Sequence, residues 1–169
     1  MKRFFLISAI AAGLSACGAL PISVALDPAS YSFGASQPAV GTVIYPAAAS
    51  AFSQAPVNVA SVTVRGQAAI NSLGTTSVTG AIYGRISDPA TDPKCTSSPT
   101  FVSCPAATET KLSSDLTLTS SKSAFEIGGD TLKQAVNTGK IWLGLELKSG
   151  FSANLTLKLT DMVATVTLF

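Results

Sequence analysis

The sequence predicts an all-β protein, a single antiparallel β-sandwich of seven to nine strands with one short helix near residues 130–138. Apolar and polar residues alternate along several stretches of the chain, as in strands that bury one face. Clusters of Gly, Pro, Asn, Asp and Ser separate these stretches, and a single segment has helical spacing. We divide the chain into a leader at residues 1–16, a tether and edge-strand segment at 17–56, and the main body at 57–169.

The segment before residue 57 contains two short strand-like stretches, Ile22–Leu26 and Thr42–Tyr45. Prolines at positions 28, 38 and 46 interrupt it, and proline confines a strand to sheet edges or ends. We therefore expect a tether of a few residues followed by edge strands. The Ala-, Pro-, Ser- and Gly-rich composition also fits a segment without fixed structure.

Two longer stretches, Val57–Ile70 and Thr76–Ile86, follow with clear alternation. In the first, the apolar phase changes near Ala60-Ser61, which is typical of a β-bulge. The short polar linker between the stretches predicts that they form an antiparallel hairpin.

The last third of the chain contains the one helical signal. Asp130 is the expected N-cap of a two-turn helix, because apolar residues follow at helical spacing and Gly139 ends the pattern. Strand-like alternation resumes in Ile141–Lys148 and in Asn154–Phe169, where the phase shifts near Asp161. The apolar helix positions are Leu132, Ala135 and Val136.

Composition excludes several classes of function. The chain has 11 Lys and Arg, 9 Asp and Glu, and no His. Once Lys2 and Arg3 of the leader are set aside, the two signs balance, so we expect no nucleic-acid partner. Without His there is no imidazole metal ligand and no Ser-His-Asp triad. We expect no cofactor, no metal site and no catalytic site, and we do not interpret the chain as an enzyme.

The first 17 residues have a distinct pattern. Lys2 and Arg3 precede an apolar stretch of about ten residues, which is too short to span a membrane and is typical of a secretory signal. It ends in Leu14-Ser15-Ala16-Cys17, an aliphatic residue, two small residues and a cysteine. This segment resembles the lipobox of bacterial lipoproteins. No family is identified for the rest of the chain.

The resemblance implies that Cys17 receives a diacylglyceryl group and that the chain is cut just before it. Acyl chains contribute about 0.8 kcal/mol per buried CH₂, so two or more hold a protein durably at a membrane. Gly18 stands where many lipoproteins kept at the inner membrane have Asp, which favours the outer membrane or cell surface. The alternative is an ordinary secretory signal cut after Ala16 or Ala19, with Cys17 an incidental thiol.

The other two cysteines, Cys95 and Cys104, lie in a turn-rich segment. An exported protein meets an oxidising compartment, so we expect these thiols to form a structural disulfide. Metal ligation is the competing interpretation, although two thiols without a third soft ligand make a poor zinc site.

Alternation also groups four residues that are candidates for binding. Trp142 and Glu146 share one strand face, and Tyr83 and Arg85 share another. Aromatic rings beside charges on a solvated sheet face could stack on a sugar or on a partner's apolar side chain. In the simpler interpretation the protein itself covers Trp142, beneath the cysteine loop or the helix.

These observations predict a lipid-anchored protein of the bacterial cell envelope. We expect a structural or partner-binding role, in which the protein docks to another envelope protein or to cell-wall glycan. The alternative is a lipoprotein that binds a small ligand or carbohydrate through Trp142 and Tyr83.

Overall fold

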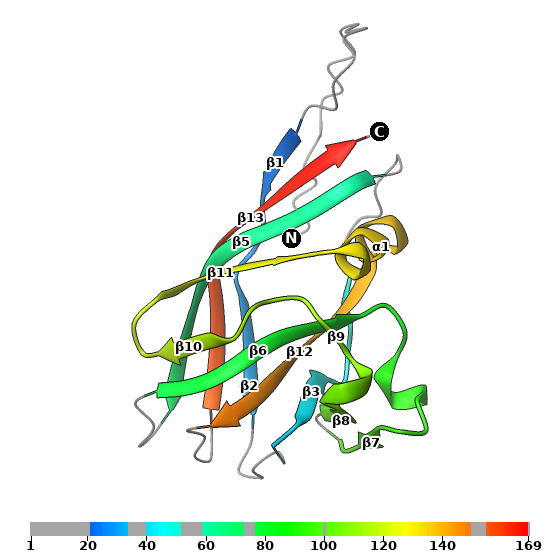
Figure 1. Cartoon of the computed structure of the whole chain (residues 1–169), viewed down its shortest axis with the longest axis vertical. Helices are drawn as coiled ribbons and strands as arrows, with labels where there is room; N and C mark the ends of the chain where they lie inside the picture. The colour runs from blue at the N-terminus through cyan, green and yellow to red at the C-terminus, as the bar shows by residue number, and fades with distance from the viewer. Residues whose placement is uncertain are drawn as a thin grey trace, which may run out of the picture.

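A computed structural model shows two antiparallel β-sheets packed face to face, with one short helix (Figure 1). The predicted all-β class is therefore confirmed. The described residues form thirteen strands, more than predicted, because three strands of two residues each occur and the segment before residue 57 contributes four. No helix in this part of the chain is long and apolar enough to cross a membrane. The structure describes residues 21–33, 40–51, 59–72, 77–99, 101–149 and 155–168.

The five-stranded sheet has the order β1-β13-β5-β11, and β2 also pairs with β13. β1 and β2 follow one another along the same edge of β13, from Pro21 opposite Thr167 to Phe33 opposite Leu155. The strands are β1 (Pro21–Ala25), β2 (Ala29–Phe33), β5 (Val59–Ser72), β11 (Ser123–Gly128) and β13 (Leu155–Leu168).

The eight-stranded sheet has the order β10-β6-β12-β3-β8-β7, with β4 beside β12 and β9 beside β6. Its longer strands are β3 (Thr42–Pro46), β6 (Ser77–Arg85), β8 (Phe101–Pro105), β10 (Leu116–Thr119) and β12 (Lys140–Ser149). Its two-residue strands are β4 (Ser50–Ala51), β7 (Thr96–Ser97) and β9 (Thr110–Lys111), and the 3-10 turns η1 (Pro89–Thr91) and η2 (Ala106–Thr108) lie between them in sequence.

Two expectations about strand placement are wrong. β5 and β6 do not form a hairpin, because β5 pairs with β13 and β11 while β6 pairs with β12 and β10. The apolar face of β5 and the face of β6 that carries Val78 and Ile82 meet across the main core instead of lying side by side. β3 is not an edge strand either, since it lies between β12 and β8. Its Pro46 is the last residue of the strand, where a missing N–H is tolerated.

Both predicted phase changes occur in the long strands. The register between β13 and β5 shifts between Thr167 and Leu168, and residue 60 is left out of the pairing. A second shift lies between Thr160 and Val163, where Asp161 has a positive φ of 53°. An extra residue at each point shifts the alternation by one position, so that Val59 and Val62, and likewise Leu159 and Ala164, face the same core, which explains the change of phase.

Helix α1 spans Asp130–Thr138, as predicted. Its N-cap is Gly129 rather than Asp130, which lies in the first turn. Gly129 has a φ of 103°, a conformation that favours glycine over Asp. Leu132 and Ala135 are buried against the core, and Gly139 ends the helix in the left-handed conformation.

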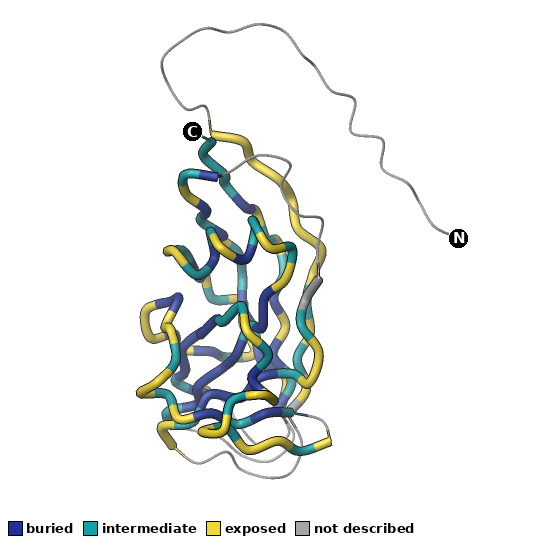
Figure 2. Tube along the Cα trace, turned by 90° about the vertical axis from the view of Figure 1, so that its right-hand side faces the viewer, coloured by how far each residue is buried: buried dark blue, intermediate teal, exposed yellow. Residues whose placement is uncertain are grey.

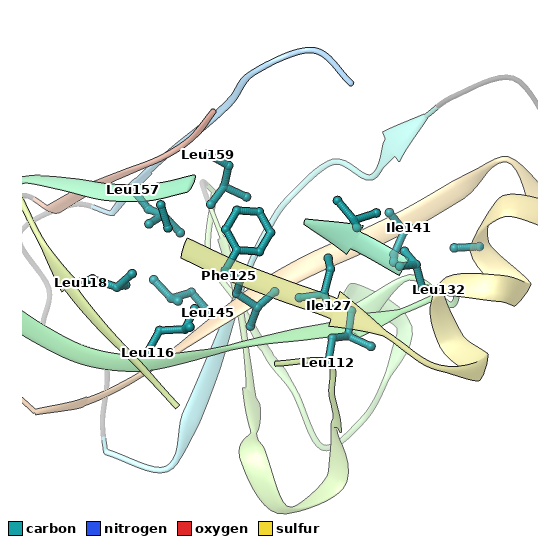
Figure 3. Close-up of a cluster of buried hydrophobic side chains, with 14 of the residues drawn as sticks. Leu112, Leu116, Leu118, Phe125, Ile127, Leu132, Ile141, Leu145, Leu157 and Leu159 are labelled. Carbon is teal, nitrogen blue, oxygen red and sulfur yellow. The ribbon is translucent and has the colours of Figure 1, made fainter. Parts of the chain in front are cut away.

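The main core lies between the two sheets and under α1 (Figure 3). Leucines and isoleucines of the five-stranded sheet, such as Leu157 and Ile127, meet Leu118 and Leu145 of the eight-stranded sheet. Figure 2 shows buried residues in the centre of the molecule and an exposed run along one edge, and every residue of β1 is exposed. The segment before residue 57 is built into the same two sheets, because β1 and β2 belong to the first sheet and β3 and β4 to the second.

Candidate functional site

The eight-stranded sheet carries a second, smaller cluster on the face turned away from the main core. Trp142 of β12, Tyr83 of β6 and Tyr45 of β3 contribute its aromatic rings. Gly144 makes the room for them, because a Cβ there would lie 2.5 Å from a ring carbon of Tyr45. The remaining buried members are Val43, Ala81, Val102 and Cys104.

The four candidate binding residues lie on this face, but the face is not solvated. Trp142 and Tyr83 are each 6% exposed and Glu146 is 7% exposed, so the expected open platform is wrong. The two rings belong to the same buried cluster as Val102 and Cys104, and the partly buried Cys95 packs against this cluster. The simpler interpretation, in which the protein itself covers Trp142, is confirmed. No described residue accepts a hydrogen bond from the indole Nε1 of Trp142, and Lys140 Nζ lies 5.7 Å from the ring centroid.

Tyr83 and Glu146 form a buried pair within this cluster. The Tyr83 hydroxyl donates to Glu146 Oε2 over 2.8 Å. Burial raises the pKa of Tyr83 to about 12, and the hydrogen bond to the Glu146 carboxylate acts in the same direction. The phenol therefore stays neutral near pH 7 and supplies a donor to a carboxylate that has left bulk water.

Arg85 joins the strand face to the cysteine loop. Its Nη1 donates to Glu109 Oε1 and its Nη2 to Asp92 Oδ2, each over 3.1 Å. Tyr45 donates its hydroxyl to Glu109 Oε2 over 2.6 Å, so both oxygens of this carboxylate are satisfied. Burial raises the pKa of Tyr45 far above its ordinary value, and the hydrogen bond to Glu109 adds to this shift. Because the Glu109 side chain is only 4% exposed, Arg85 supplies the charge that its burial requires.

Cys95 and Cys104 form the predicted disulfide beside this network. Arg85 Nη1 lies 3.7 Å from each sulfur. The two sulfurs and the Glu109 carboxylate are the only three potential metal ligands that gather closely in the described residues. As a disulfide the two sulfurs are not thiolates, and Arg85 already pairs with the carboxylate, so this group does not suit a cation.

The cluster is suited to holding strands together. Neutral phenols with a raised pKa donate hydrogen bonds but are poor bases or nucleophiles near pH 7. Two carboxylates, Asp92 and Glu109, pair with the guanidinium of Arg85. Together, the contacts of the cluster and of Arg85 join β3, β6 and β12 to the cysteine loop, residues 86–109. We therefore interpret the cluster as a structural clamp.

An open groove of about 560 Å³ lies elsewhere, along β5 and β11. Arg65 and Glu126 form an exposed ion pair of 2.8 Å in its wall, and Asp161 pairs with Lys122. Its apolar lining includes Phe125, whose ring lies over Gly66. An open groove with charges of both signs fits a polypeptide surface better than a small apolar ligand.

Sequence reasoning missed Tyr45 and Glu109. The sequence signal for Tyr45 is Gly144, which lies between Trp142 and Glu146 on one strand face. Because glycine has no side chain, this position leaves room for a ring from another strand. Glu109 has no comparable signal, because its partners come from β3 and β6. Cys17 and the leader lie outside the described residues.

Comparison with known proteins gave no matching family model, no matching curated protein and no matching solved structure.

Proposed function

We propose that this protein is a lipid-anchored component of the bacterial cell envelope with a structural or partner-binding role. The observation that carries the proposal is the sequence Leu14-Ser15-Ala16-Cys17 behind a basic head and a short apolar stretch. Acylation of Cys17 would tether the chain without any membrane-spanning helix. Gly18 favours delivery to the outer membrane or cell surface.

The arrangement of the fold is compatible with such an anchor. β1 begins at Pro21, four residues after Cys17, so the two Cα atoms are at most about 14 Å apart. The folded body would therefore lie directly at the bilayer surface. A short tether suits a protein that holds a partner close to the membrane.

The open groove along β5 and β11 supports a partner-binding role. Its charged and apolar lining can take hydrogen bonds, ion pairs and apolar contacts from an envelope protein or a cell-wall glycan. The alternative role in carbohydrate binding has no support from Trp142 and Tyr83, because a sugar cannot stack on a buried ring.

The anchor is tested by Cys17→Ser in the full chain, with the leader replaced by a secretory signal that has its own cleavage site. We expect the variant to leave the particulate fraction, whereas the parent chain stays there and its N-terminal peptide carries the mass of the acyl chains. Retention of the correctly processed variant in the particulate fraction would overturn the proposal.

The docking role is tested by native pull-down from solubilised envelope, with binding to isolated cell-wall glycan as the second assay. We expect one assay to give stoichiometric recovery, and Ala124→Arg in the groove to lower it. The matched control is Ala90→Arg, since Ala90 is also exposed but lies in the cysteine loop. Recovery of no partner in either assay would contradict the docking role and leave the anchor standing.

A further inference from the structure

One end of the five-stranded sheet continues past the eight-stranded sheet (Figure 1). Three strands form this tip, namely β1, the last part of β13 and the first part of β5. Val166 of β13 pairs with Ile22 on one side and with Val62 on the other. Two residues further from the end, Ala164 pairs with Val24 and Val64. We call these three stretches, residues 21–26, 59–64 and 162–168, the sheet tip.

The sheet tip contains no charged residue. The first charges along its strands are Asp27, Arg65 and Asp161, where the tip joins the rest of the sheet. No charged residue lies between Cys17 and Asp27 either. Charged side chains are costly to bring into the hydrocarbon core of a bilayer, so an end without charges is suited to lie at the boundary of that core.

Apolar side chains are exposed at this tip. Ile22, Val24 and Leu26 are 48%, 47% and 39% exposed. Directly opposed residues in an antiparallel pair point to the same face, and both Val166 and Ala164 pack on the main core side. Ile22 and Val24 therefore extend the core face outward to the free edge of the sheet. Helix α1 packs on β5, the strand of this sheet two places from β1.

We propose that the sheet tip lies against the bilayer, with Ile22, Val24 and Leu26 inserted into the interfacial zone. The proposal rests on the lipid anchor, because acyl chains on Cys17 would bring Pro21 within about 14 Å of the membrane surface. The shared face of Ile22 and Val24 is the one that faces lipid. The opposite end of the molecule, with the cysteine loop, then points away from the membrane.

The depth of insertion is limited by the backbone. Among the described strands β1 is the edge strand of its sheet, so its outward N–H and C=O groups have no neighbour among them. Unpaired backbone groups are not tolerated in the hydrocarbon core, but headgroups and water satisfy them at the interface. We therefore place the three side chains at the boundary between headgroups and acyl chains, about 5–10 Å deep.

The test uses the lipidated full chain in vesicles of phosphatidylethanolamine and phosphatidylglycerol, with a benzophenone amino acid at a single position. Positions 22 and 24 are compared with position 23, which is equally close to the anchor but on the other face. Position 40 is the distal control, because Val40 is 79% exposed and lies two residues before β3. Circular dichroism and the intact disulfide check that each labelled chain is folded.

We expect lipid adducts at position 24 to exceed those at position 40 by on the order of tenfold, since an inserted probe touches lipid continuously. Position 22 should behave like position 24, and position 23 should give fewer adducts than both. Equal adducts at positions 23 and 24 would overturn the proposal, because they would reflect nearness to the anchor alone. Crosslinked dimers from position 24 would also overturn it, since β1 would then face a second copy.

These outcomes are distinct from failure of the anchor. If Cys17 carries its acyl chains and position 24 gives no lipid adduct, the anchor stands and the contact surface is wrong. If Cys17 carries no acyl chain, the proposed function itself fails.

Discussion

The two ends of this molecule differ in whether the chain itself covers their apolar sheet surfaces. At the end with the cysteine loop, an outward sheet face is covered by the chain itself, and its carboxylates are buried with hydrogen-bond donors. At the sheet tip, apolar side chains remain exposed and charges are absent. Both faces arise from the same alternation of apolar and polar residues, so alternation assigns a residue to a face without telling what lies over it.

The contrast is clearest in the exposure of two arginine–glutamate ion pairs. Arg85 pairs with Glu109, and the two side chains are 15% and 4% exposed. Arg65 pairs with Glu126 at the base of the sheet tip, and these side chains are 74% and 56% exposed. Water screens the second pair but has been largely removed from the first, so the same kind of ion pair has a different energy at each end.

The largest effect is expected for Arg85→Ala. The substitution leaves the Glu109 carboxylate buried without its cation, and loss of one partner of a buried pair costs about 3–5 kcal/mol of unfolding free energy. Arg65→Ala is the matched control and should cost less than about 1 kcal/mol. Urea unfolding of both variants, made in the Cys17→Ser chain, measures the difference. Equal losses would show that the cysteine-loop end does not depend on its buried charges.

A second test removes the disulfide that holds the same end. Cys95→Ala together with Cys104→Ala should lower the unfolding free energy by about 3 kcal/mol, from loop-closure entropy across the sequence separation of 9 residues. Hydrogen exchange should accelerate in β8, where Cys104 pairs with Val43 of β3. The amides of β1 that pair with β13 should change much less. A uniform acceleration in both regions would mean that the two ends unfold as one unit.

Most local structure of this protein could be predicted from its sequence, because it depends on neighbours along the chain. The helix at 130–138 and the phase changes near Ala60 and Asp161 follow from residue spacing alone, and all three occur. The disulfide follows from an even pair of cysteines in a chain that we expect to be exported, and it is present.

What the sequence could not predict depends on long-range pairing. The partners of β5 and β6 are remote in sequence, so a hairpin and a pair of facing strands have the same local pattern. The covering of Trp142 requires β3 to lie beside β12 and β8, which no local signal encodes. The candidate site was therefore assigned to the correct face, with the wrong exposure.

The smallest expected effect is a loss of stability at alkaline pH, through ionisation of Tyr83 at the cysteine-loop end. The pKa of Tyr83 is about 12 in the folded protein and near 10 when unfolded, so between these values the folded state binds more protons. Stability linked to Tyr83 is therefore complete below pH 10 and falls as pH rises toward 12, by about 1 kcal/mol at pH 11. Tyr83→Phe should remove this part of the slope, even though it leaves Glu146 without a donor and lowers stability at every pH. Unfolding free energies of both chains between pH 8 and pH 11 test this linkage. If the unfolding free energies of the two chains fell in parallel with pH, the hydroxyl of Tyr83 would lie in solvent. Tyr83 would then not be a buried part of the structural clamp.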